Sequence, residues 1–403
     1  MGDILFLAHR LPYPPDRGDR IRSHALLRAA AAHARVHLAV FVDSAADLAQ
    51  AEALRPLVSS LYVEERKRSR LFALADAFSH GRPLSLSLFD SATMRAHVTR
   101  TLAAEPVSTI FVFSSQMAQF VPDDIVGRRF VMDFVDVDSA KFASYAAAGG
   151  PLAAVHAREA RLLAAWERAV AHRADVSLFV SDAEAALFRR SVSDANIVSL
   201  GNGVDLDRFS PTAAFEPMTE GEGPLIVFTG QMDYRPNVDG VDRFAREVLP
   251  AVRARFHDAR FAIVGRSPTA AVRRLAALPG VIVTGEVADV RPWLAAAAAV
   301  VVPLEIARGI QNKLLEAMAM GRPVVASPAA FAGIDALPGR DLIVADSADQ
   351  AEAIIRLLGD AAQAAAMGRA ARRQIVARYA WDEVLASLPA LLDGEQRVAE
   401  QVA

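Results

Sequence analysis

Short apolar runs alternate with alanine-rich stretches along the chain, and this alternation constrains the fold more than any other feature. A run of about four to eight apolar residues between turn residues is typical of a buried strand, whereas alanine favours helix. Strands that alternate with helices predict parallel sheets with helices on both faces. A first series of strands is expected at 4–8, 36–42, 110–113, 130–134, 176–180 and 197–200. A second series is expected at 225–229, 261–264, 281–284, 300–302, 324–326 and 342–344.

A segment rich in turn residues separates the two series. It covers 210–224 and contains three prolines, two glycines and three glutamates, as expected of a linker. We therefore expect an α/β protein with two doubly wound domains, 1–205 and 206–381, the second opening with a linker at 206–224. A C-terminal helix at 382–403 is expected to pack back on the first domain. Ligands of such sheets bind beyond the carboxyl ends of the strands, which makes a cleft between the domains the default site.

Composition favours a large enzyme over a small binding module. The chain has 403 residues, 53% of them hydrophobic, and a net charge of −3, so it can bury two cores and offers no electrostatic case for nucleic acid. It contains no cysteine, which excludes disulfides and thiolate metal sites and fits a cytoplasmic protein. No apolar run approaches the roughly 18 residues of a membrane span. Asp3, Pro12 and Pro14 near the start make a signal peptide unexpected.

The segment 308–327 is interpreted as a loop, a short helix and a buried strand. Leu314, Leu315 and Met318 recur at helical spacing, Gly321 fits a left-handed C-terminal cap, and Pro323 prevents continuation. Free backbone N–H groups at the start of such a helix form a natural anion site.

Lys313 and Glu316 lie three residues apart and share a face of this helix. The ammonium group could neutralise a phosphate, and the carboxylate could accept hydrogen bonds from sugar hydroxyls. The alternative is a surface Lys–Glu pair on an ordinary helix.

The loop after the first strand carries a second set of charges. Gly18 lies at the expected strand-to-helix turn, where glycine allows a backbone to approach a phosphate or sugar closely. Arg17, Arg20 and Arg22 add positive charge on this side, with a solvated helix start as the alternative.

Three acidic residues lie at or just after the carboxyl end of the strand at 130–134. Asp133, Asp136 and Asp138 could form a metal-like carboxylate cluster, an acceptor-binding edge or a capped loop.

The segment from Glu316 to Val325, Glu-Ala-Met-Ala-Met-Gly-Arg-Pro-Val-Val, resembles the donor-binding signature of retaining glycosyltransferases of family 4, which have the GT-B fold. That signature places two glutamates with seven residues between them. Here Arg308 stands at the first position and Glu316 at the second. Further similar phrases cover nearly the whole chain in the order of the family: Asn202-Gly-Val-Asp205, Arg208-Phe-Ser-Pro211, Phe228-Thr-Gly-Gln-Met-Asp233, Val264-Gly265 and Val283-Thr-Gly-Glu-Val287.

The resemblance implies two Rossmann-like domains that face a central cleft, and a nucleotide-diphosphate sugar as co-substrate. The implied donor-binding residues are Gly230, Glu286, Val287, Arg308, Gly309, Asn312, Lys313 and Glu316. The implied catalytic residues are Gly18, Asp136, Arg235 and Lys313, with Arg17 and Arg22 on the acceptor side. In the family, Glu316 would hold the nucleotide ribose, and Asp136 would stand for a His-Asp pair that is Val135-Asp136 here. Gln231 and Pro236 occupy the positions of the family's basic diphosphate clasp, so Arg235 with Lys313 is expected to substitute. No metal and no cofactor are expected.

Within the family, the phrases at 8–22, 133–139 and 308–313 resemble sugar transferases of exopolysaccharide clusters associated with PEP-CTERM/exosortase sorting. This implies a polyprenyl-linked saccharide acceptor at the inner membrane face. The basic residues Arg66, Lys67, Arg68 and Arg70 precede an apolar stretch and suit contact with anionic lipid, with a solvated charged face as the alternative.

Two other functions stay open: a nucleotide-sugar epimerase with the same layout, and a non-catalytic pseudo-glycosyltransferase, which the arginine at 308 makes conceivable. A nicotinamide dehydrogenase is discounted, because no Gly-x-Gly-x-x-Gly follows an expected strand.

Overall fold

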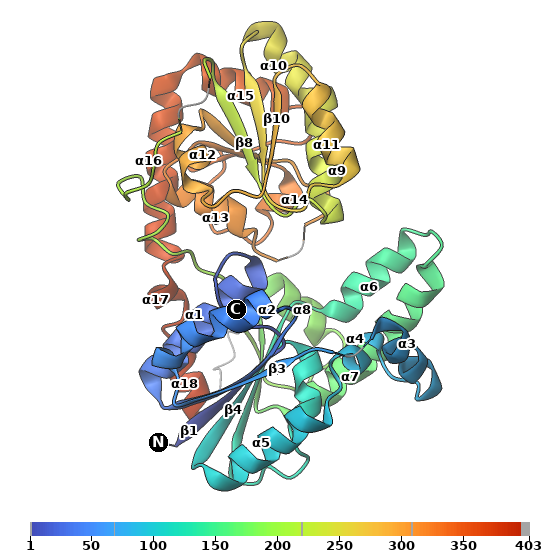
Figure 1. Cartoon of the computed structure of the whole chain (residues 1–403). Coiled ribbons are helices and arrows are strands. Elements are labelled where there is room, and N and C mark those ends of the chain that lie inside the picture. Colours follow the sequence, from blue (N-terminus) through green and yellow to red (C-terminus); the bar gives the residue numbers. More distant parts are fainter. Residues whose placement is uncertain (1, 68, 219–220, 308, 396–403) are drawn as a thin grey trace. The chain divides into compact units, whose positions relative to one another are not determined.

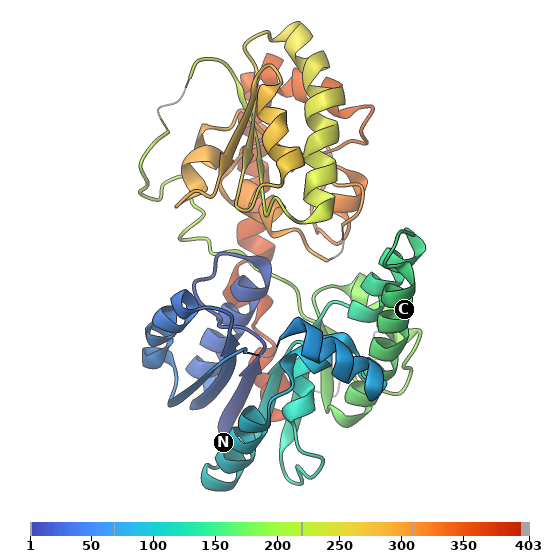
Figure 2. The same ribbon diagram turned by 45° about the vertical axis from the view of Figure 1, so that its right-hand side comes forward.

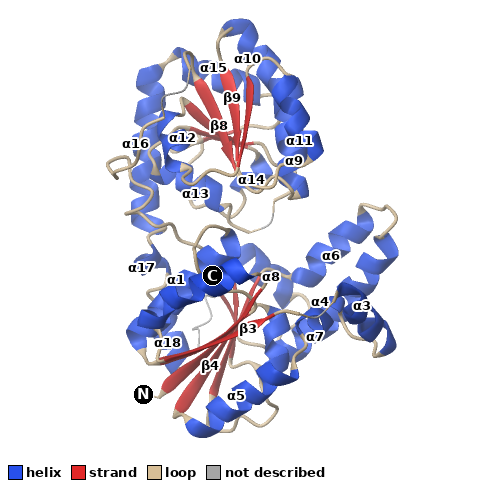
Figure 3. Cartoon of the chain, viewed as in Figure 1, coloured by secondary structure: helices blue, strands red, loops and turns tan. Residues whose placement is uncertain are grey.

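A computed structural model describes residues 2–67, 69–218, 221–307 and 309–395, and divides the chain into two compact units. The first unit contains the described residues up to Gly201 and those from Leu385 onward. The second unit is Asn202–Val384. Each unit is built on one parallel sheet with helices on both faces, which confirms the predicted α/β class (Figures 1 and 3).

The described part of the first unit has a seven-stranded sheet in the order β3-β2-β1-β4-β5-β6-β7. Its strands are β1 (Asp3–Ala8), β2 (Val36–Val42), β3 (Ser60–Glu65), β4 (Val107–Phe113), β5 (Arg129–Val135), β6 (Val176–Phe179) and β7 (Ile197–Ser199). Its helices are α1 (Gly18–His33), α2 (Ala45–Gln50), η1 (Ala51–Leu57), α3 (Arg70–Ser79), α4 (Leu84–Phe89), α5 (Ala92–Ala104), η2 (Ser115–Phe120), α6 (Asp138–Ala147), α7 (Ala153–Arg173), α8 (Asp182–Arg189) and α18 (Leu388–Asp393).

Helices α1 and α18 cover one face of this sheet, and α5 and α7 cover the other (Figure 3). Helices α6 and α7 pack together as a hairpin, which Figure 2 shows in green. The C-terminal helix α18 is tied to the strands by its carbonyl groups: the side chains of Arg129 and Thr109 donate to Leu391 and Leu392 at 2.6 and 3.2 Å.

The described part of the second unit has a six-stranded sheet in the order β10-β9-β8-β11-β12-β13. Its strands are β8 (Leu225–Thr229), β9 (Arg260–Val264), β10 (Val281–Gly285), β11 (Ala299–Val302), β12 (Val324–Ala326) and β13 (Ile343–Val344). Its helices are α9 (Arg235–Arg243), the π-helical η3 (Phe244–Val248), α10 (Leu249–Arg255), α11 (Ala270–Arg274), η4 (Leu275–Ala277), α12 (Arg291–Ala296), α13 (Asn312–Ala319), α14 (Pro328–Phe331), α15 (Gln350–Gly359), α16 (Ala361–Arg378) and α17 (Trp381–Val384).

All twelve expected strands are present among the described residues, and the sequence missed one, β3. This strand lies at the edge of its sheet and pairs only with β2, with His37 opposite Ser60. Its side chains are exposed or half-buried, so it lacks the continuous apolar run that marks a central strand.

The expected linker is part of the second unit where the structure describes it. Phe209 is buried, and Phe215 and Met218 pack against the core of that unit. The packing of these side chains therefore makes the segment part of the second unit, despite its proline and glycine content. The predicted cap at Gly321 is confirmed: this residue follows α13 with φ +65°.

A buried ion pair connects α1 to β5 inside the first unit. Arg22 and Asp133 are 1% and 0% exposed, and the guanidinium Nε donates to a carboxylate oxygen at 2.9 Å. A second guanidinium nitrogen donates to the carbonyl of Gly201 at 2.8 Å. Arg22 was expected to add positive charge on the acceptor side. That expectation was wrong, because the positive charge of Arg22 is balanced by Asp133 inside the core and is not presented to an acceptor.

Removing one partner of this pair should destabilise the first unit. Asp133→Ala leaves a buried guanidinium without its carboxylate, which costs about 3–5 kcal/mol. Urea unfolding followed by circular dichroism should show an earlier transition. The double change Arg22→Met with Asp133→Leu leaves no buried charge and should recover most of the loss. Equal stability of Asp133→Ala and the wild type would contradict this role.

Candidate functional site

A lysine at the start of α13 is the centre of the candidate site in the second unit. Lys313 is half-buried, and its Nζ donates to Oδ1 of Asn237 at 2.6 Å. The ammonium group also lies 4.7 Å from the centroid of the Phe228 ring. Asn237, in α9, is held by a 2.8 Å bond from its Nδ2 to the carbonyl of Gln231, after β8. Helices α9 and α13 and the end of β8 thus position the ammonium group of Lys313.

Burial lowers the pKa of Lys313 to about 7, and the nearby charge of Glu316 opposes this shift. Among the described residues, no carboxylate oxygen lies within ion-pair distance of its Nζ. A cation kept out of water without an anionic partner is costly, and a bound anion would restore its charge. This is the environment expected of a phosphate-binding lysine.

Glu316 lies one turn further along α13 and is also half-buried. Burial raises its pKa to about 7, while the positive charges of Arg208 and then Lys313 act in the opposite direction. The buried Nε of Arg208 has no hydrogen-bond partner in the part of the chain that the structure describes. The lysine thus has a carboxyl group near it, and that carboxyl group has a guanidinium group near it.

The sequence did not assign a role to Arg208 or Asn237. Arg208 was noted only as part of a family phrase, and its segment comes near α13 because Nδ2 of Asn202 donates to Oδ1 of Asn312 at 3.1 Å. That contact joins residues 110 positions apart, so no local pattern could reveal it.

Two backbone positions complete this part of the site. A Cβ atom on Gly230 would lie 2.9 Å from Nδ2 of Asn237 and 3.2 Å from Nζ of Lys313. Only glycine leaves room for the lysine there. The start of α13 has no side-chain cap, so its amide groups are not covered by Gln311. The structure thus brings together Gly230, Asn312, Lys313 and Glu316 of the predicted donor residues.

Other predicted donor residues lie apart from this cluster or are not described. Arg235 is 79% exposed and pairs with Asp239 on its own helix at 3.4 Å, so the structure does not join it to Lys313. Glu286 is exposed, and Val287 packs against the core. Gly309 has φ +61°, and Arg308 lies outside the described residues.

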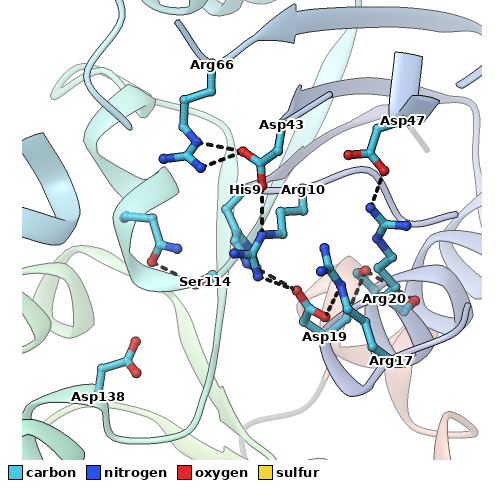
Figure 4. Close-up of polar contacts among 12 residues, drawn as sticks. His9, Arg10, Arg17, Asp19, Arg20, Asp43, Asp47, Arg66, Ser114 and Asp138 are labelled. Atoms are coloured by element: carbon cyan, nitrogen blue, oxygen red, sulfur yellow. Dashed lines mark hydrogen bonds and ion pairs between the residues drawn. The ribbon is translucent and has the colours of Figure 1, made fainter. Parts of the chain in front are cut away.

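In the first unit, the loop after β1 forms a dense ion-pair network (Figure 4). One carboxylate oxygen of Asp19 lies 3.0 Å from Nη1 of Arg10, and the other lies 3.1 Å from Nε of Arg17. Burial alone would raise the pKa of Asp19, but the charges beside it, including both arginines, hold it below its ordinary value. The charge of Arg17 is therefore largely matched, contrary to the expected positive surface. Gly18 begins α1, as predicted, without a positive φ.

Behind this network His9 stacks on Phe113 at 5.8 Å between ring centroids. Burial lowers its pKa to about 4, so the imidazole is neutral at pH 7. Its Nδ1 is buried and has no partner among the described residues. Nothing in the sequence singles out this histidine, because one histidine in an apolar context is usually a core residue.

Asp136 lies at the carboxyl end of β5, as predicted, in an acidic and half-buried environment. Burial, with the charges of Glu184 and Asp138, raises its pKa to about 6. Its Oδ1 is buried without a partner among the described residues. The preceding Val135 has φ +70°, which is strained for a β-branched residue. An unsatisfied carboxylate on a strained turn indicates selection for function over stability.

The strained residues share one location in both units. The described non-glycine residues with positive φ are Ser114, Val135 and Ser267. Each lies at, or within three residues of, the carboxyl end of a strand, after β4, in β5 and after β9. Strain of this kind concentrates at functional sites.

Comparison with known proteins identifies the fold of the chain and gives a family match for part of its sequence. The structure resembles Anabaena Alr3699/HepE, solved in complex with UDP and glucose, with a TM-score of 0.69 and 16% identity over 98% of this chain and 100% of that one. Both units therefore have the fold of the GT-B class. Residues 223–360 match the family described as "Glycosyl transferases group 1".

Two curated relatives are similar over part of their length. The "GDP-mannose-dependent alpha-(1-6)-phosphatidylinositol monomannoside mannosyltransferase" of Mycobacterium tuberculosis is 32% identical over 250 residues, 57% of this chain. The "Phosphatidyl-myo-inositol mannosyltransferase" of Propionibacterium freudenreichii is 31% identical over 193 residues, 47% of this chain. The chain spans 64% and 49% of the lengths of these relatives. These matches agree with the predicted resemblance to group 1 glycosyltransferases over the matched segments.

Within the residues that the structure describes, none of the helices combines the length and the apolar character needed to cross a bilayer.

The ionisation of Asp136 should cost stability. Its pKa is about 6 in the folded chain and about 4 in an unfolded one, so the cost is absent near pH 4 and complete above pH 6. Asp136→Asn should match the wild type near pH 4 and exceed it by about 1–3 kcal/mol above pH 6. Denaturant unfolding from pH 4.5 to 7.5 measures this difference. The exposed Asp124→Asn is the control, and a pH-independent difference would refute the assignment.

Proposed function

We propose that the protein is a retaining glycosyltransferase that moves a sugar from a nucleotide-diphosphate sugar to a lipid-linked or saccharide acceptor. The observation that carries this proposal is the desolvated Lys313 at the start of α13, which donates to Asn237 and has Glu316 near it, with Arg208 near Glu316. It lies within the segment that matches the group 1 family. The relative named as GDP-mannose-dependent and the fold relative solved with UDP support a nucleotide-linked donor.

In this proposal Lys313 and the amide groups at the start of α13 bind the donor diphosphate. Asn237 keeps the ammonium group in place by accepting its hydrogen bond. Glu316 accepts hydrogen bonds from the ribose hydroxyl groups, and Arg208 favours its ionised form. The cost of keeping these charges out of water is offset only when the donor is bound.

The transfer step forms a bond between the acceptor oxygen and the anomeric carbon and breaks the bond to the diphosphate. No described side chain is an evident covalent nucleophile, so we favour attack from the face of the leaving group, with retention. The hydroxyl proton of the acceptor passes to the departing phosphate oxygen. Asp136 is assigned to the sugar or acceptor, whose hydroxyl groups would satisfy its unpartnered Oδ1. The step uses no metal, and Asp133 is already engaged by Arg22.

The acceptor is assigned to a lipid-linked saccharide at the cytoplasmic face of a membrane. Two relatives carry phosphatidylinositol acceptors in their names, which supports a lipid-linked class. The role in exopolysaccharide synthesis rests on the resemblance to PEP-CTERM-associated transferases described above. Contact with anionic lipid through the segment around Arg66 and Lys67 is part of the proposal.

Donor binding should depend on Lys313 and Glu316. Lys313→Met and Glu316→Ala each remove a charge-assisted interaction, so the affinity for UDP- or GDP-linked sugars should fall by about 10–100-fold. Thermal shift with a donor panel, followed by titration calorimetry, measures this effect. Both variants should melt no earlier than the wild type without ligand, since each removes a poorly solvated charge. Unchanged affinity would remove the residue from the site.

Arg235→Ala is the matched control, because Arg235 is exposed and paired with Asp239. We expect an affinity change of less than about threefold. A loss equal to that of Lys313→Met would show that Arg235 turns toward the diphosphate when the donor binds, as the family resemblance implies.

A transfer assay separates the remaining functions. Incubation of the wild type with nucleotide sugars should release nucleoside diphosphate only when a lipid-linked acceptor is present. An epimerised donor without acceptor would indicate an epimerase. Donor binding without release under any acceptor would indicate a pseudo-glycosyltransferase.

A further inference from the structure

The turn between β5 and α6 is held by buried carboxylates at alternate positions. Three of its amides each donate to one carboxylate: Val135 to Asp133 at 3.0 Å, Val137 to Glu184 at 2.8 Å and Ser139 to Glu167 at 3.0 Å. These carboxylates come from β5, α8 and α7 and are 0%, 6% and 1% exposed. The hydroxyl group of Ser139 also donates to Glu167. Glu167 and Glu184, which reach the turn from other elements, are called the acidic clamp below.

A buried carboxylate is a costly acceptor for a backbone amide. A carbonyl or hydroxyl oxygen can accept the same hydrogen bond without a charge, whereas an ionised group loses hydration when it is buried. Asp133 is compensated by Arg22, but no basic side chain lies within ion-pair distance of Glu167 or Glu184 in the described part of the chain. Burial raises the pKa of Glu167 to about 7, although its hydrogen bonds from Ser139 favour the ionised form. The shape of this turn is thus kept at a cost in stability.

The clamp fixes the residues that lie between its contacts. Val137 and Ser139 are buried, whereas Asp136 and Asp138 are half-buried. Val135 has φ +70°, a strained conformation for a β-branched residue, so the turn needs contacts from outside to keep its shape. Within this fixed turn, Oδ1 of Asp136 is buried and has no partner among the described residues. The clamp therefore holds one acceptor oxygen in a defined place and leaves it available to a ligand.

The clamp also acts on Asp136 through charge. The charged side chains that act on this carboxyl group come from three helices: Glu184 of α8, Asp138 and Lys141 of α6, and Arg22 of α1. After burial, the charge of Glu184 is the largest cause that raises the pKa of Asp136 to about 6, while Lys141 and Arg22 act in the opposite direction. A carboxylate with a higher pKa is a better acceptor for the hydrogen of a hydroxyl group. Glu184 therefore influences both the position and the basicity of Asp136.

We infer that Glu184 and Glu167 are positioning residues, which hold the turn 135–139 so that the carboxylate of Asp136 meets a hydroxyl group of the sugar or acceptor. This deepens the proposed function and rests on it for the nature of that ligand. Both glutamates act through the turn, because their carboxylates are buried and bonded to its amides.

Helix α7 also supplies a matched control, Glu159. Like Glu167, this residue is buried and accepts from both the amide and the hydroxyl group of a serine at a helix start, here Ser85 of α4 at 3.0 and 2.9 Å. Its charge is not among the main causes that shift the pKa of Asp136. A change at Glu159 thus removes the same kind of contact without touching the turn 135–139.

The ionisation of Asp136 tests the clamp without donor or acceptor. Denaturant unfolding from pH 4.5 to 7.5 measures the stability gained by Asp136→Asn, first in the wild type and then in Glu184→Gln. Glutamine keeps an oxygen for the Val137 amide but removes the charge, so the pKa of Asp136 should fall from about 6 toward its ordinary value. The gain above pH 6 should therefore shrink, because ionisation of Asp136 then costs less. In Glu159→Gln the gain should equal that in the wild type.

Transfer kinetics test the position of the turn. Glu184→Ala and Glu167→Ala each release one of its amides, so kcat should fall at least about tenfold. The donor affinity should stay unchanged, because the residues assigned to the diphosphate lie in the second unit. Glu184→Gln should recover most of kcat, and the acidic limb of its pH profile of kcat/KM should move to lower pH, since Asp136 stays ionised there. Glu159→Gln should keep the wild-type kcat and pH profile.

Each of three results would overturn the inference: an unchanged gain from Asp136→Asn in Glu184→Gln, a wild-type kcat in Glu184→Ala, or an equal loss of kcat in Glu159→Gln. The last would show that kcat follows stability alone. Rates are compared below the melting temperature of the least stable variant, and Glu184→Gln with Glu167→Ala carries the test where Glu184→Ala is unfolded. Absence of transfer by the wild type would reject the proposed function, whereas a lowered pKa of Asp136 in Glu184→Gln would still establish the effect of the clamp on that carboxyl group.

Discussion

All strands of a parallel sheet end at the same edge, and the polar features of this protein follow from that constraint. At this edge the ladder of hydrogen bonds stops, so backbone groups and polar side chains must find other partners. The second unit collects Gly230, Asn237 and Lys313 beyond β8 and β11, and the first collects His9 and Asp136 beyond β1 and β5. The strained residues lie at the same edges. In each unit, the candidate functional residues thus lie at the edge where the strands of its sheet end.

The charges at these edges differ from charges that only stabilise. Arg22 and Asp133 are buried together and satisfy each other, so the pair connects α1 to β5 and leaves nothing for a ligand. Burial lowers the pKa of Lys313 and raises the pKa values of Glu316 and Asp136, so it favours the neutral form of each group. Such groups destabilise the empty protein and gain when a ligand supplies the missing charge or hydrogen bond.

Much of the fold could be predicted because its signals are local. Central strands are continuous apolar runs, while β3 escaped notice because an edge strand needs no such run. Lys313 and Glu316 were singled out because their spacing places them on one helix face and their segment resembles the donor-binding signature. Arg208 and Asn237 were missed because they reach the site through packing between distant segments. Arg22 shows the opposite error: a basic residue in a promising loop was assigned to a ligand, although the structure gives it a buried carboxylate within the protein.

Helix α3 shows why an apolar pattern alone does not tell which face of a helix is buried. Leucine and phenylalanine at helical spacing are usually interpreted as the buried face, and the alanines between them as filler. Here Arg158 and Glu159 fix the helix in the reverse orientation, because they bond its last turn and the start of α4 to α7. Alanine at positions 73 and 77 permits close packing on the unit, so the larger side chains face outward. The free energy of burying these larger side chains is therefore not used within the described part of the unit.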